Sequence, residues 1–534
     1  MNTRFQVAII GGGPVGMALA IELGQRGISC VNVERRTEPH RIPKGQGLTQ
    51  HAMEHFYRWG VADKVRSARV LPQGFSLRGV TAYLNLSSEY WYSPPFREVV
   101  NTYYFQDSER LPQYLTESVL RTRMAELSSV HSRVGWTAET VEQDDASVRV
   151  GIVSQQGERE IFEADYAVGC DGSHSTVRTL VGIERDRQDF DQLMVLAVIR
   201  SRELHEGLKR FPPRSTYRAM DPELKGYWRF FGRVDAEEGF FFHAPVPKDT
   251  TRDNYDFHGL MERAAGFKFA CEFDYVGFWD MAVAIAKQYQ VGRVFIAGDA
   301  AHSHPPYGGY GLNNGLDDVS NLGWKLAARL NGWGSDALLQ TYTEERQPVF
   351  WETAEDFILG RIRADRDLLE RYDPDRDREE FARVWEKAKT DTAMRAMTYD
   401  PHCEGSSIVF GPPGSVCSAH GTHTFEARPG HHLPSRQLSN GRNVFETLGR
   451  EFTLLAFGAE DRAVAMLEQA SRSLGVPLTV IRDSDAGERE AYKARLILVR
   501  PDHYVAWTGD SAPDNAMAII GKAVGRAAKS LPSL

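Results

Sequence analysis

The chain of 534 residues is long enough for two or three domains, and its hydrophobic share of 42% and charged share of 25% are those of a soluble globular protein. A net charge of -9 argues against nucleic acid or an anionic membrane as the main partner, and no apolar run reaches membrane-spanning length. Five widely spread cysteines without metal-ligand spacing, and an N-terminus without the layout of a secretory signal, predict a cytoplasmic protein that binds no metal.

The N-terminal stretch predicts a βαβ unit with a strand, a Gly-rich turn, a helix and a second strand, at residues 5–10, 11–16, 17–25 and 28–33. The turn carries the GxGxxG fingerprint of dinucleotide-binding folds. In that fingerprint Gly11 makes the tight turn, Gly13 lets the backbone meet a pyrophosphate and Gly16 lets the helix pack on the strand. Glu34 ends the second strand and can bind a ribose diol. The fingerprint does not separate NAD from FAD.

Two further segments place polar groups where an apolar strand ends. The predicted strand 161–169 delivers Asp171 and Gly172, which alone would be an ordinary turn. The strand 293–297 ends at Asp299, and a Pro- and Gly-rich loop leads to an amphipathic helix, 312–330. A carboxylate there can accept hydrogen bonds from sugar-like hydroxyls, and glycines at a helix start let backbone N–H groups approach an electron-rich ligand. The plainer alternative is a core strand and helix, with Asp299 only a cap.

The stretches between these segments, 70–106 and 185–285, alternate apolar and polar residues as an antiparallel sheet does and are rich in aromatics. A helix is predicted over 356–371, followed by a charged stretch at 373–383. The Gly-, Ser-, His- and Pro-rich residues 401–432 predict a linker. Beyond it the predicted order of strands and helices is thioredoxin-like, at 452–457, 459–474, 477–482, 495–499, 504–507 and 514–528. Because no cysteine follows Cys417, this region cannot run dithiol chemistry, and a structural or dimer-related role is expected.

Three motifs occur in one order: GxGxxG, then DGSHSxxR, then GD-AAH-PPxGGxGxN. With Tyr342, Glu345, Arg346 and Pro348 as a helix-end YxxERxP, the chain resembles the class A flavoprotein monooxygenases, the FAD-dependent aromatic hydroxylases. The phrases FTLLAFG and LVRPDHYVAWTGD resemble the phenol hydroxylase-like branch, which includes aromatic-polyketide and indolocarbazole tailoring oxygenases.

The resemblance implies an α/β fold in which a Rossmann-type, p-hydroxybenzoate hydroxylase-like FAD-binding domain is interleaved with a mixed β-sheet substrate domain. The FAD-binding domain would comprise residues 1–69, 107–184 and 286–400. The substrate domain would comprise residues 70–106 and 185–285, and a thioredoxin-like domain would follow the linker at 433–534.

The resemblance also implies site residues. Those that would bind FAD are Gly11, Gly13, Pro14, Gly16, Glu34, Arg35, Lys44, Gln113, Asp171, Gly172, Asp299, Pro306, Gly309, Gly311, Leu312 and Asn313. Among them Asp171 and Gly172 match a motif associated with both FAD and NAD(P)H, and Asp299 matches the acid on the ribityl chain. Pro306, Gly308 and Gly309 would lie in the loop at the isoalloxazine edge, closest to the chemistry, and no general base is assigned.

The chain departs from the family pattern at His51, which stands where an arginine for the pyrophosphate is expected. Candidates for substrate contact are Tyr227, Arg229, His243 and Tyr310. Tyr310 either borders the active site or simply packs.

The function implied is that of a monooxygenase in which NADPH or NADH reduces FAD and O₂ then gives a flavin C4a-hydroperoxide, which hydroxylates a small aromatic, phenolic substrate. The protein would be a monomer or a homodimer. Two alternatives remain: another FAD oxidoreductase, an oxidase or a reductase, on the same scaffold, and a non-catalytic flavin-fold binding protein. The substrate and the choice between NADH and NADPH stay open.

Overall fold

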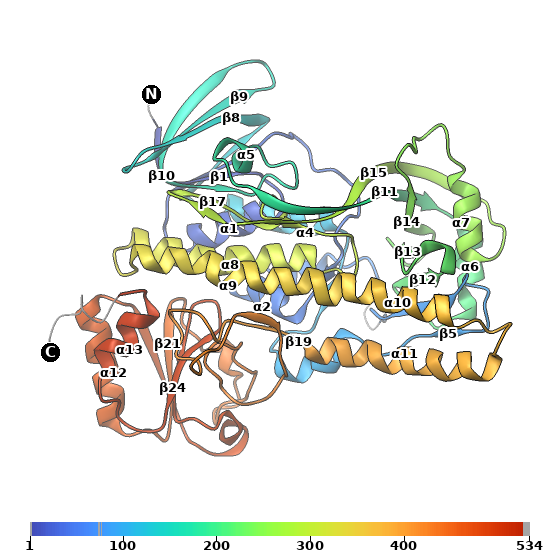
Figure 1. Ribbon diagram of the computed structural model, residues 1–534. Coiled ribbons are helices and arrows are strands. Elements are labelled where there is room, and N and C mark those ends of the chain that lie inside the picture. Colours follow the sequence, from blue (N-terminus) through green and yellow to red (C-terminus); the bar gives the residue numbers. More distant parts are fainter. Residues whose placement is uncertain (1–2, 73–74, 76, 527–534) are drawn as a thin grey trace.

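The computed structural model describes residues 3–72, 75 and 77–526, and it has a mixed α/β fold built on two large sheets and one smaller one (Figure 1). The first sheet has the strand order β16-β17-β10-β1-β2-β7, with β8 and β9 added beside β10. Its strands are β1 (Thr3–Ile10), β2 (Cys30–Glu34), β7 (Val130–Val134), β8 (Trp136–Gln143), β9 (Val148–Ser154), β10 (Arg159–Gly169), β16 (Gln290–Val291) and β17 (Val294–Ile296). The central pairs β17–β10, β10–β1, β1–β2 and β2–β7 are parallel, as a Rossmann-type sheet requires.

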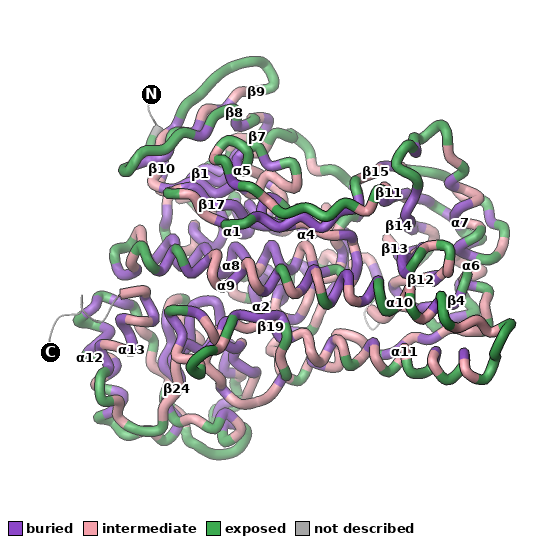
Figure 2. The backbone as a smooth tube through the Cα atoms, in the orientation of Figure 1, coloured by how far each residue is buried: buried purple, intermediate pink, exposed green. Residues whose placement is uncertain are grey.

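Helices cover this parallel sheet and bury its apolar strands. Val7 to Ile9 of β1 are fully buried, and they share one core with α1 (Pro14–Gly24), α4 (Gln113–Ala125) and α8 (Gly311–Leu330). The α1 helix begins at Pro14, whose fixed φ suits the first helical turn. Figure 2 shows α1 and α8 as mostly buried helices, as expected for elements enclosed on several sides. The short elements nearby are β3 (Gly47–Leu48), α2 (Gln50–Arg58), α3 (Ala62–Ser67), β6 (Glu109–Arg110) and α5 (Thr176–Leu180).

The second sheet has the order β18-β15-β11-β14-β13-β12-β4-β5. Its strands are β4 (Gly79–Tyr83), β5 (Trp91–Tyr92), β11 (Arg185–Arg200), β12 (Thr216–Met220), β13 (Trp228–Arg233), β14 (Gly239–Pro247), β15 (Glu272–Ala286) and β18 (His302–Ser303). The long strands β11 and β15 connect the two sheets (Figure 1). One face of the sheet packs against α6 (Arg202–Gly207) and α7 (Phe257–Ala265), which leaves the other face available to a cavity.

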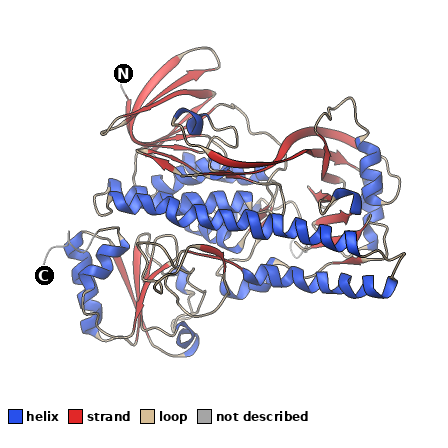
Figure 3. Ribbon diagram, viewed as in Figure 1, coloured by secondary structure: helices blue, strands red, loops and turns tan. Residues whose placement is uncertain are grey.

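A long helical rod runs past both sheets (Figure 3). It consists of α9 (Asp336–Glu352), a π-helical segment η5 (Thr353–Leu359) and α10 (Gly360–Arg371), so the helix predicted from residue 356 begins earlier and changes pitch on the way. The charged stretch predicted at 373–383 overlaps a second long helix, α11 (Arg378–Thr398). Asp377 caps α11 by accepting from the Glu380 N–H, and Glu379 and Glu380 fill the first turn, where acidic residues favour the helix dipole.

The connecting segment 401–432 is bonded to both of its neighbours along much of its length. The strands β19 (Tyr399–His402) and β20 (Ser418–His420) pair with each other. The Ser406 hydroxyl donates to Glu345 of α9 at 2.6 Å, and the Phe410 N–H donates to the Ala506 carbonyl at 2.9 Å. The segment predicted to be a linker therefore packs into the molecule.

The C-terminal domain has a four-stranded sheet of order β22-β21-β23-β24 with β21 and β22 parallel, the thioredoxin-like arrangement. Its elements are β21 (Phe452–Phe457), α12 (Asp461–Leu474), β22 (Leu478–Asp483), η7 (Gly487–Tyr492), β23 (Leu496–Val499), β24 (Val505–Gly509) and α13 (Ala516–Ala523). Phe452 shares a hydrophobic core with Trp324 of α8, so the domain is docked on the FAD-binding region. Parts of the predicted ranges, at 1–2, 73–74, 76 and 527–534, lie outside the described residues. None of the helices in the described ranges is long and apolar enough to cross a bilayer.

A buried ion-pair network joins the same two regions. Glu345 on α9 accepts from both terminal nitrogens of Arg500, each at 2.8 Å, and from Lys325 Nζ at 2.8 Å. Arg500 also pairs with Asp502. All four side chains are almost completely buried.

Candidate active site

A cavity of about 970 Å³ lies between the first sheet and the uncovered face of the second. Many of the residues predicted to bind FAD or to lie at the flavin edge line it, namely Gly13, Pro14, Lys44, Gln113, Gly172, Asp299, Pro306, Gly308, Gly309, Gly311 and Leu312. The cavity therefore brings together segments that are up to about 300 residues apart in the chain, by difference of these residue numbers.

Two of the three motif glycines in the Gly-rich turn have no room for a side chain, and the third faces open space. Gly11 has φ +114°, and a Cβ there would lie 2.2 Å from the Cys170 carbonyl oxygen. A Cβ on Gly16 would lie 2.0 Å from the carbonyl oxygen of Gly11, so both positions exclude a side chain for packing reasons. A Cβ on Gly13 would meet nothing within 4 Å, and Gly13 borders the cavity. This open position leaves room for a phosphate group against the backbone at the start of α1.

Glu34 ends β2 and holds the turn in place. Its Oε2 accepts from the Gly12 N–H at 2.7 Å, and its Oε1 accepts from the Arg36 N–H at 2.8 Å. A carboxylate has about four lone-pair sites, so hydroxyl groups of a ribose can still bind. Arg35 is exposed and does not line the cavity, and its carbonyl accepts from the Gln155 side chain.

Hydrogen bonds from Arg178 connect the segment around Asp171 with the segment around Asp299. Asp171 Oδ2 accepts from the Val177 N–H at 3.1 Å, while its Oδ1 is buried without a partner. Arg178 donates to the carbonyls of Ser173 at 3.1 Å and Ala300 at 2.9 Å. These bonds fix the two turns relative to each other at one edge of the parallel sheet.

Asp299 faces the cavity in the single 3₁₀ turn η4 (Gly298–Ala300), which follows β17. No described residue donates a hydrogen bond to its carboxylate, which leaves it free to accept from a ligand. Burial raises its pKa above the ordinary value, and His302 and Lys44 act in the opposite direction. An unpaired acceptor that is exposed to the cavity fits a ligand that carries hydroxyl donors.

Side chains from the predicted substrate domain and from α8 form hydrogen bonds with the predicted flavin-edge loop. Gly308 and Gly309 have φ of +72° and +66°, the left-handed region that favours glycine. Arg97, in η1 (Arg97–Tyr103), donates to their carbonyls at 2.6 and 3.2 Å. Asn313 donates to Gly309 O at 2.8 Å and accepts from the Thr49 N–H at 2.8 Å, so it braces the loop without lining the cavity.

The loop leads directly into α8, and its N-terminal residues Gly311 and Leu312 line the cavity. The helix dipole and free N–H groups there favour negative charge on a bound group. Gln113 begins α4 on another side of the cavity, where its Oε1 accepts from the Gly45 N–H at 3.0 Å. Lys44 adds a positive charge beside Asp299.

Of the four substrate candidates, His243 lines the cavity and the other three do not. Burial lowers the pKa of His243 to about 3, so its ring is neutral at pH 7. Arg229 pairs with Asp221 at 2.7 Å, and Tyr227 packs in a hydrophobic core. Tyr310 packs against Tyr399, with ring centroids 4.7 Å apart, and lines a separate small cavity.

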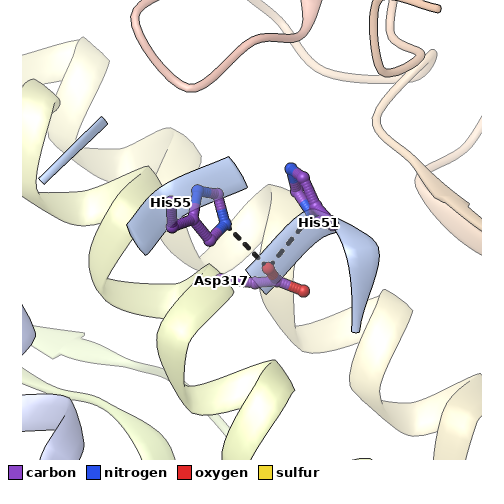
Figure 4. Close-up of side chains that lie close together, drawn as sticks. All are labelled: His51, His55 and Asp317. Atoms are coloured by element: carbon purple, nitrogen blue, oxygen red, sulfur yellow. Dashed lines mark hydrogen bonds and ion pairs between the residues drawn. The ribbon is translucent and has the colours of Figure 1, made fainter. Parts of the chain in front are cut away.

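His51 does not line the large cavity, and Figure 4 shows it beside Asp317 together with His55. Its Nδ1 lies 3.1 Å from Asp317 Oδ1, and His55 Nε2 lies 3.0 Å from the same oxygen. His51 therefore belongs to a largely buried cluster with His55 and Asp317 that lies outside this cavity. Within the described ranges, the groups of side chains close enough to share an ion are His51, His55 and Asp317; His51, Glu54 and His432; and His402, Glu404 and His431. The absence of a metal stays a prediction.

Several cavity residues were not predicted because no sequence motif marks them. Arg97, Arg110 and Arg218 line the wall together with aromatic side chains of the second sheet, Trp228, Phe230, Phe241, Phe278 and Trp279. The sequence shows that these stretches alternate and are rich in aromatics, but it does not say which residues of each strand face the cavity.

Comparisons with known proteins agree with this geometry. The FAD binding domain family matches residues 4–356, and the family described as aromatic-ring hydroxylase, C-terminal, matches residues 426–527. The FAD-dependent monooxygenase apdD of Emericella nidulans is 29% identical over 97% of this chain and 90% of its own length. The tetracenomycin A2 monooxygenase-dioxygenase of Streptomyces glaucescens is 28% identical over 97% of this chain and 96% of its own length.

Among solved structures, the rebeccamycin biosynthetic enzyme RebC with reduced flavin superimposes with a TM-score of 0.83 at 29% identity, covering 99% of this chain and 100% of that one. The FAD binding domain family covers well over half of the chain. The chain belongs to the class A flavoprotein monooxygenases, the FAD-dependent aromatic hydroxylases.

Proposed function

We propose that this enzyme hydroxylates a polycyclic aromatic phenol, with NADPH or NADH as transient electron donor and O₂ as the source of the oxygen atom. The observation that carries the proposal is the cavity, which continues from the predicted cofactor residues onto a sheet face lined by Trp228, Phe230, Phe241, Phe278 and Trp279. A wall of this kind suits several fused rings. One relative of this chain is named as a tetracenomycin A2 monooxygenase-dioxygenase.

In this proposal the chain's own residues bind and orient the cofactor. Gly13 and the start of α1 hold the pyrophosphate, Glu34 a ribose, and Asp299 the hydroxyls of the ribityl chain. The N-terminus of α8 and the glycines at 308 and 309 favour negative charge at the flavin edge. FAD, when bound, accepts a hydride from NAD(P)H and activates O₂.

The protein excludes water and positions the substrate. The aromatic side chains remove the substrate ring from solvent, and neutral His243 can exchange a hydrogen bond with a hydroxyl group without adding charge. Arg97 holds the carbonyls of Gly308 and Gly309, so their N–H groups keep a fixed direction. We assign no general base. We also propose a cytoplasmic monomer or homodimer, in keeping with the five free cysteines.

The test is a panel of mono- and polycyclic phenols assayed for stimulated NAD(P)H oxidation under ¹⁸O₂. The expected result is a product about 18 mass units heavier than the substrate, because a C–H bond becomes C–¹⁸OH with a net gain of one labelled oxygen atom, and little hydrogen peroxide. Hydrogen peroxide as the only oxygen product across the panel would favour an oxidase. A purified protein that retains no flavin would favour a non-catalytic binding protein.

A further inference from the structure

Two histidines and a glutamate meet where α2 contacts the segment that leads into the C-terminal domain. His51 and Glu54 lie on α2 in an i, i+3 arrangement, so they project from the same side of the helix. His432 lies at the end of the connecting segment, and its backbone pairs with that of Tyr504, the residue before β24. One ring nitrogen of each histidine and one carboxylate oxygen of Glu54 all lie within 4.8 Å of one another. Two distant parts of the chain therefore bring two imidazoles and a carboxylate together.

His51 has one ring nitrogen engaged and one free. Its Nδ1 lies 3.1 Å from Asp317 Oδ1, whereas its Nε2 is buried and has no hydrogen-bond partner among the described residues. A carboxylate only accepts hydrogen bonds, so in the neutral ring Nδ1 carries the proton and Nε2 carries the lone pair. A carboxylate on the far nitrogen is the usual support of a metal-binding histidine, because it fixes the ring and raises its basicity. His51 thus has the arrangement of a metal ligand.

Glu54 is a fully buried carboxylate that no permanent cation neutralises. Its Oε1 accepts from the Phe105 N–H at 2.7 Å, and its Oε2 lies 2.6 Å from His432 Nε2. Within the described ranges, His432 is the ion partner of Glu54, and no lysine or arginine pairs with this carboxylate. A histidine supplies positive charge only when it is protonated, and an uncompensated buried carboxylate is costly. A metal ion bound by Glu54 and His432 would supply that charge without a proton.

A cavity of about 60 Å³ adjoins this group, and His51, His432, Tyr104 and Tyr504 are among the residues that line it. The cavity has room for at least one water molecule. Zinc commonly takes three protein ligands, with histidine nitrogens and a carboxylate oxygen among them, and keeps a fourth position for water. Calcium and magnesium prefer oxygen ligands, so two imidazoles favour a transition metal of the zinc class.

The other two groups that are close enough to share an ion are already engaged in hydrogen bonds. Asp317 Oδ1 contacts both His51 Nδ1 and His55 Nε2, and the second nitrogen of His55 lies 3.2 Å from a serine hydroxyl. In the group that contains Glu404, each histidine ring nitrogen has a hydrogen-bond partner. The group with Glu54 differs because it can use an unpartnered nitrogen, Nε2 of His51.

We propose that His51, Glu54 and His432 bind one divalent metal ion of the zinc class, with water as the fourth ligand. The ion joins α2 of the FAD-binding region to the segment that enters the C-terminal domain, so its role is structural. It also supplies a positive charge at the position where the family pattern has an arginine and this chain has His51. The inference goes beyond the proposed function, and it replaces the expectation of no metal, which came from the cysteine pattern.

The experiment uses the untagged, FAD-loaded full-length enzyme after dialysis against a chelator. Zinc uptake is measured by elemental analysis after excess Zn²⁺ is removed, and Co²⁺ is titrated as a coloured replacement. We expect about one ion per chain, visible Co²⁺ absorption typical of four-coordination, and a higher Tm with Zn²⁺ than after chelation. Asp317→Asn, which removes the carboxylate charge behind His51, should weaken Co²⁺ binding by about 10- to 100-fold. His51→Ala and His432→Ala remove ligands and should weaken it further.

The matched control is His431→Ala, the same change at the residue next to His432 but in another group. It should take up Zn²⁺ and Co²⁺ as the wild type does. Wild-type enzyme that binds neither ion would overturn the proposal even if the variants failed to fold. Metal that stays bound in folded His51→Ala and His432→Ala proteins would show adventitious binding and overturn it too. Loss of the metal in His51→Ala alone would assign the ion to the group with His55 and Asp317 instead, which contradicts the proposed ligands.

Discussion

Replacing Asp299 with alanine should weaken FAD binding without unfolding the protein. The carboxylate faces the cavity, no described residue donates a hydrogen bond to it, and its removal leaves no protein donor unpaired. A buried charge-assisted hydrogen bond is worth about 1.5–3 kcal/mol, so FAD affinity should fall by roughly 10- to 150-fold. The measurement is a titration of flavin-stripped protein with FAD, followed by quenching of flavin fluorescence.

The control is Asp280→Ala, which removes an acid from the same cavity where it lies 3.4 Å from Arg187 in the second sheet. Its FAD affinity should match that of the wild type. Burial raises the pKa of Asp299, so its carboxylate becomes protonated at a higher pH than the carboxylate of an exposed aspartate. As the pH is lowered, the FAD affinity of the wild type should therefore begin to fall at a higher pH than an ordinary aspartate would cause, and Asp299→Asn should lose this dependence. An Asp299→Ala protein that purifies with full flavin occupancy and unchanged affinity would refute the assignment.

Five further outcomes are expected. Arg500→Ala should destabilise the fold by about 3–5 kcal/mol in denaturant unfolding, because it leaves buried Glu345 without its main counter-charge, and Arg500→Lys should cost less. Since the folded-state pKa of Glu345 is depressed, its contribution is present above about pH 4.3 and is lost as the pH falls toward the folded value, which an acid-unfolding titration would show. A chain ending at Arg428 should aggregate or change its mass by light scattering, since docking surface around Trp324 becomes exposed; a soluble, active monomer would contradict this. Arg97→Ala should raise the ratio of hydrogen peroxide to hydroxylated product, and an unchanged ratio would show that its bonds to Gly308 and Gly309 are dispensable. Reduction of bound FAD, followed in stopped flow at about 450 nm, should be several-hundred-fold faster with a true substrate, a change of about 3–4 kcal/mol; equal rates would rule out gating by substrate.

The parts of the structure that the sequence predicted well are those with strong local signals. Gly11, Gly13 and Gly16 stand in a turn between a buried strand and a helix, and the positions are specified by backbone sterics alone. Asp299 and Gly308 were located in the same way, through strand ends and glycine patterns. Such features depend on neighbours within a few residues, so a single sequence contains them.

The substrate side could not be predicted because it depends on strand register. Arg218 and Arg229 lie on adjacent strands of one sheet, yet Arg218 faces the cavity and Arg229 pairs with Asp221. A shift of one residue in either strand would exchange such roles, and only pairing with distant strands decides it. The helix α11 was missed for a different reason, since its cap at Asp377 lies inside a run of charged residues without a clear apolar stripe.

Contacts between the N-terminal and C-terminal regions of the chain have a consequence for biosynthesis. Arg26, at the end of the N-terminal helix, bonds to Glu451, 425 residues later, and Glu54 bonds to His432 at 2.6 Å. At a ribosomal rate of about 5–20 residues per second, roughly 20 to 85 s pass between the emergence of Arg26 and that of its partner. Throughout that interval the partners of these charged groups are missing, so the groups stay exposed to water on a surface of the nascent flavin-binding region. The C-terminal domain later covers that surface. The last hundred residues therefore act late in synthesis as an intramolecular cover, and a chain that stalls before they emerge presents that surface to chaperones and proteases.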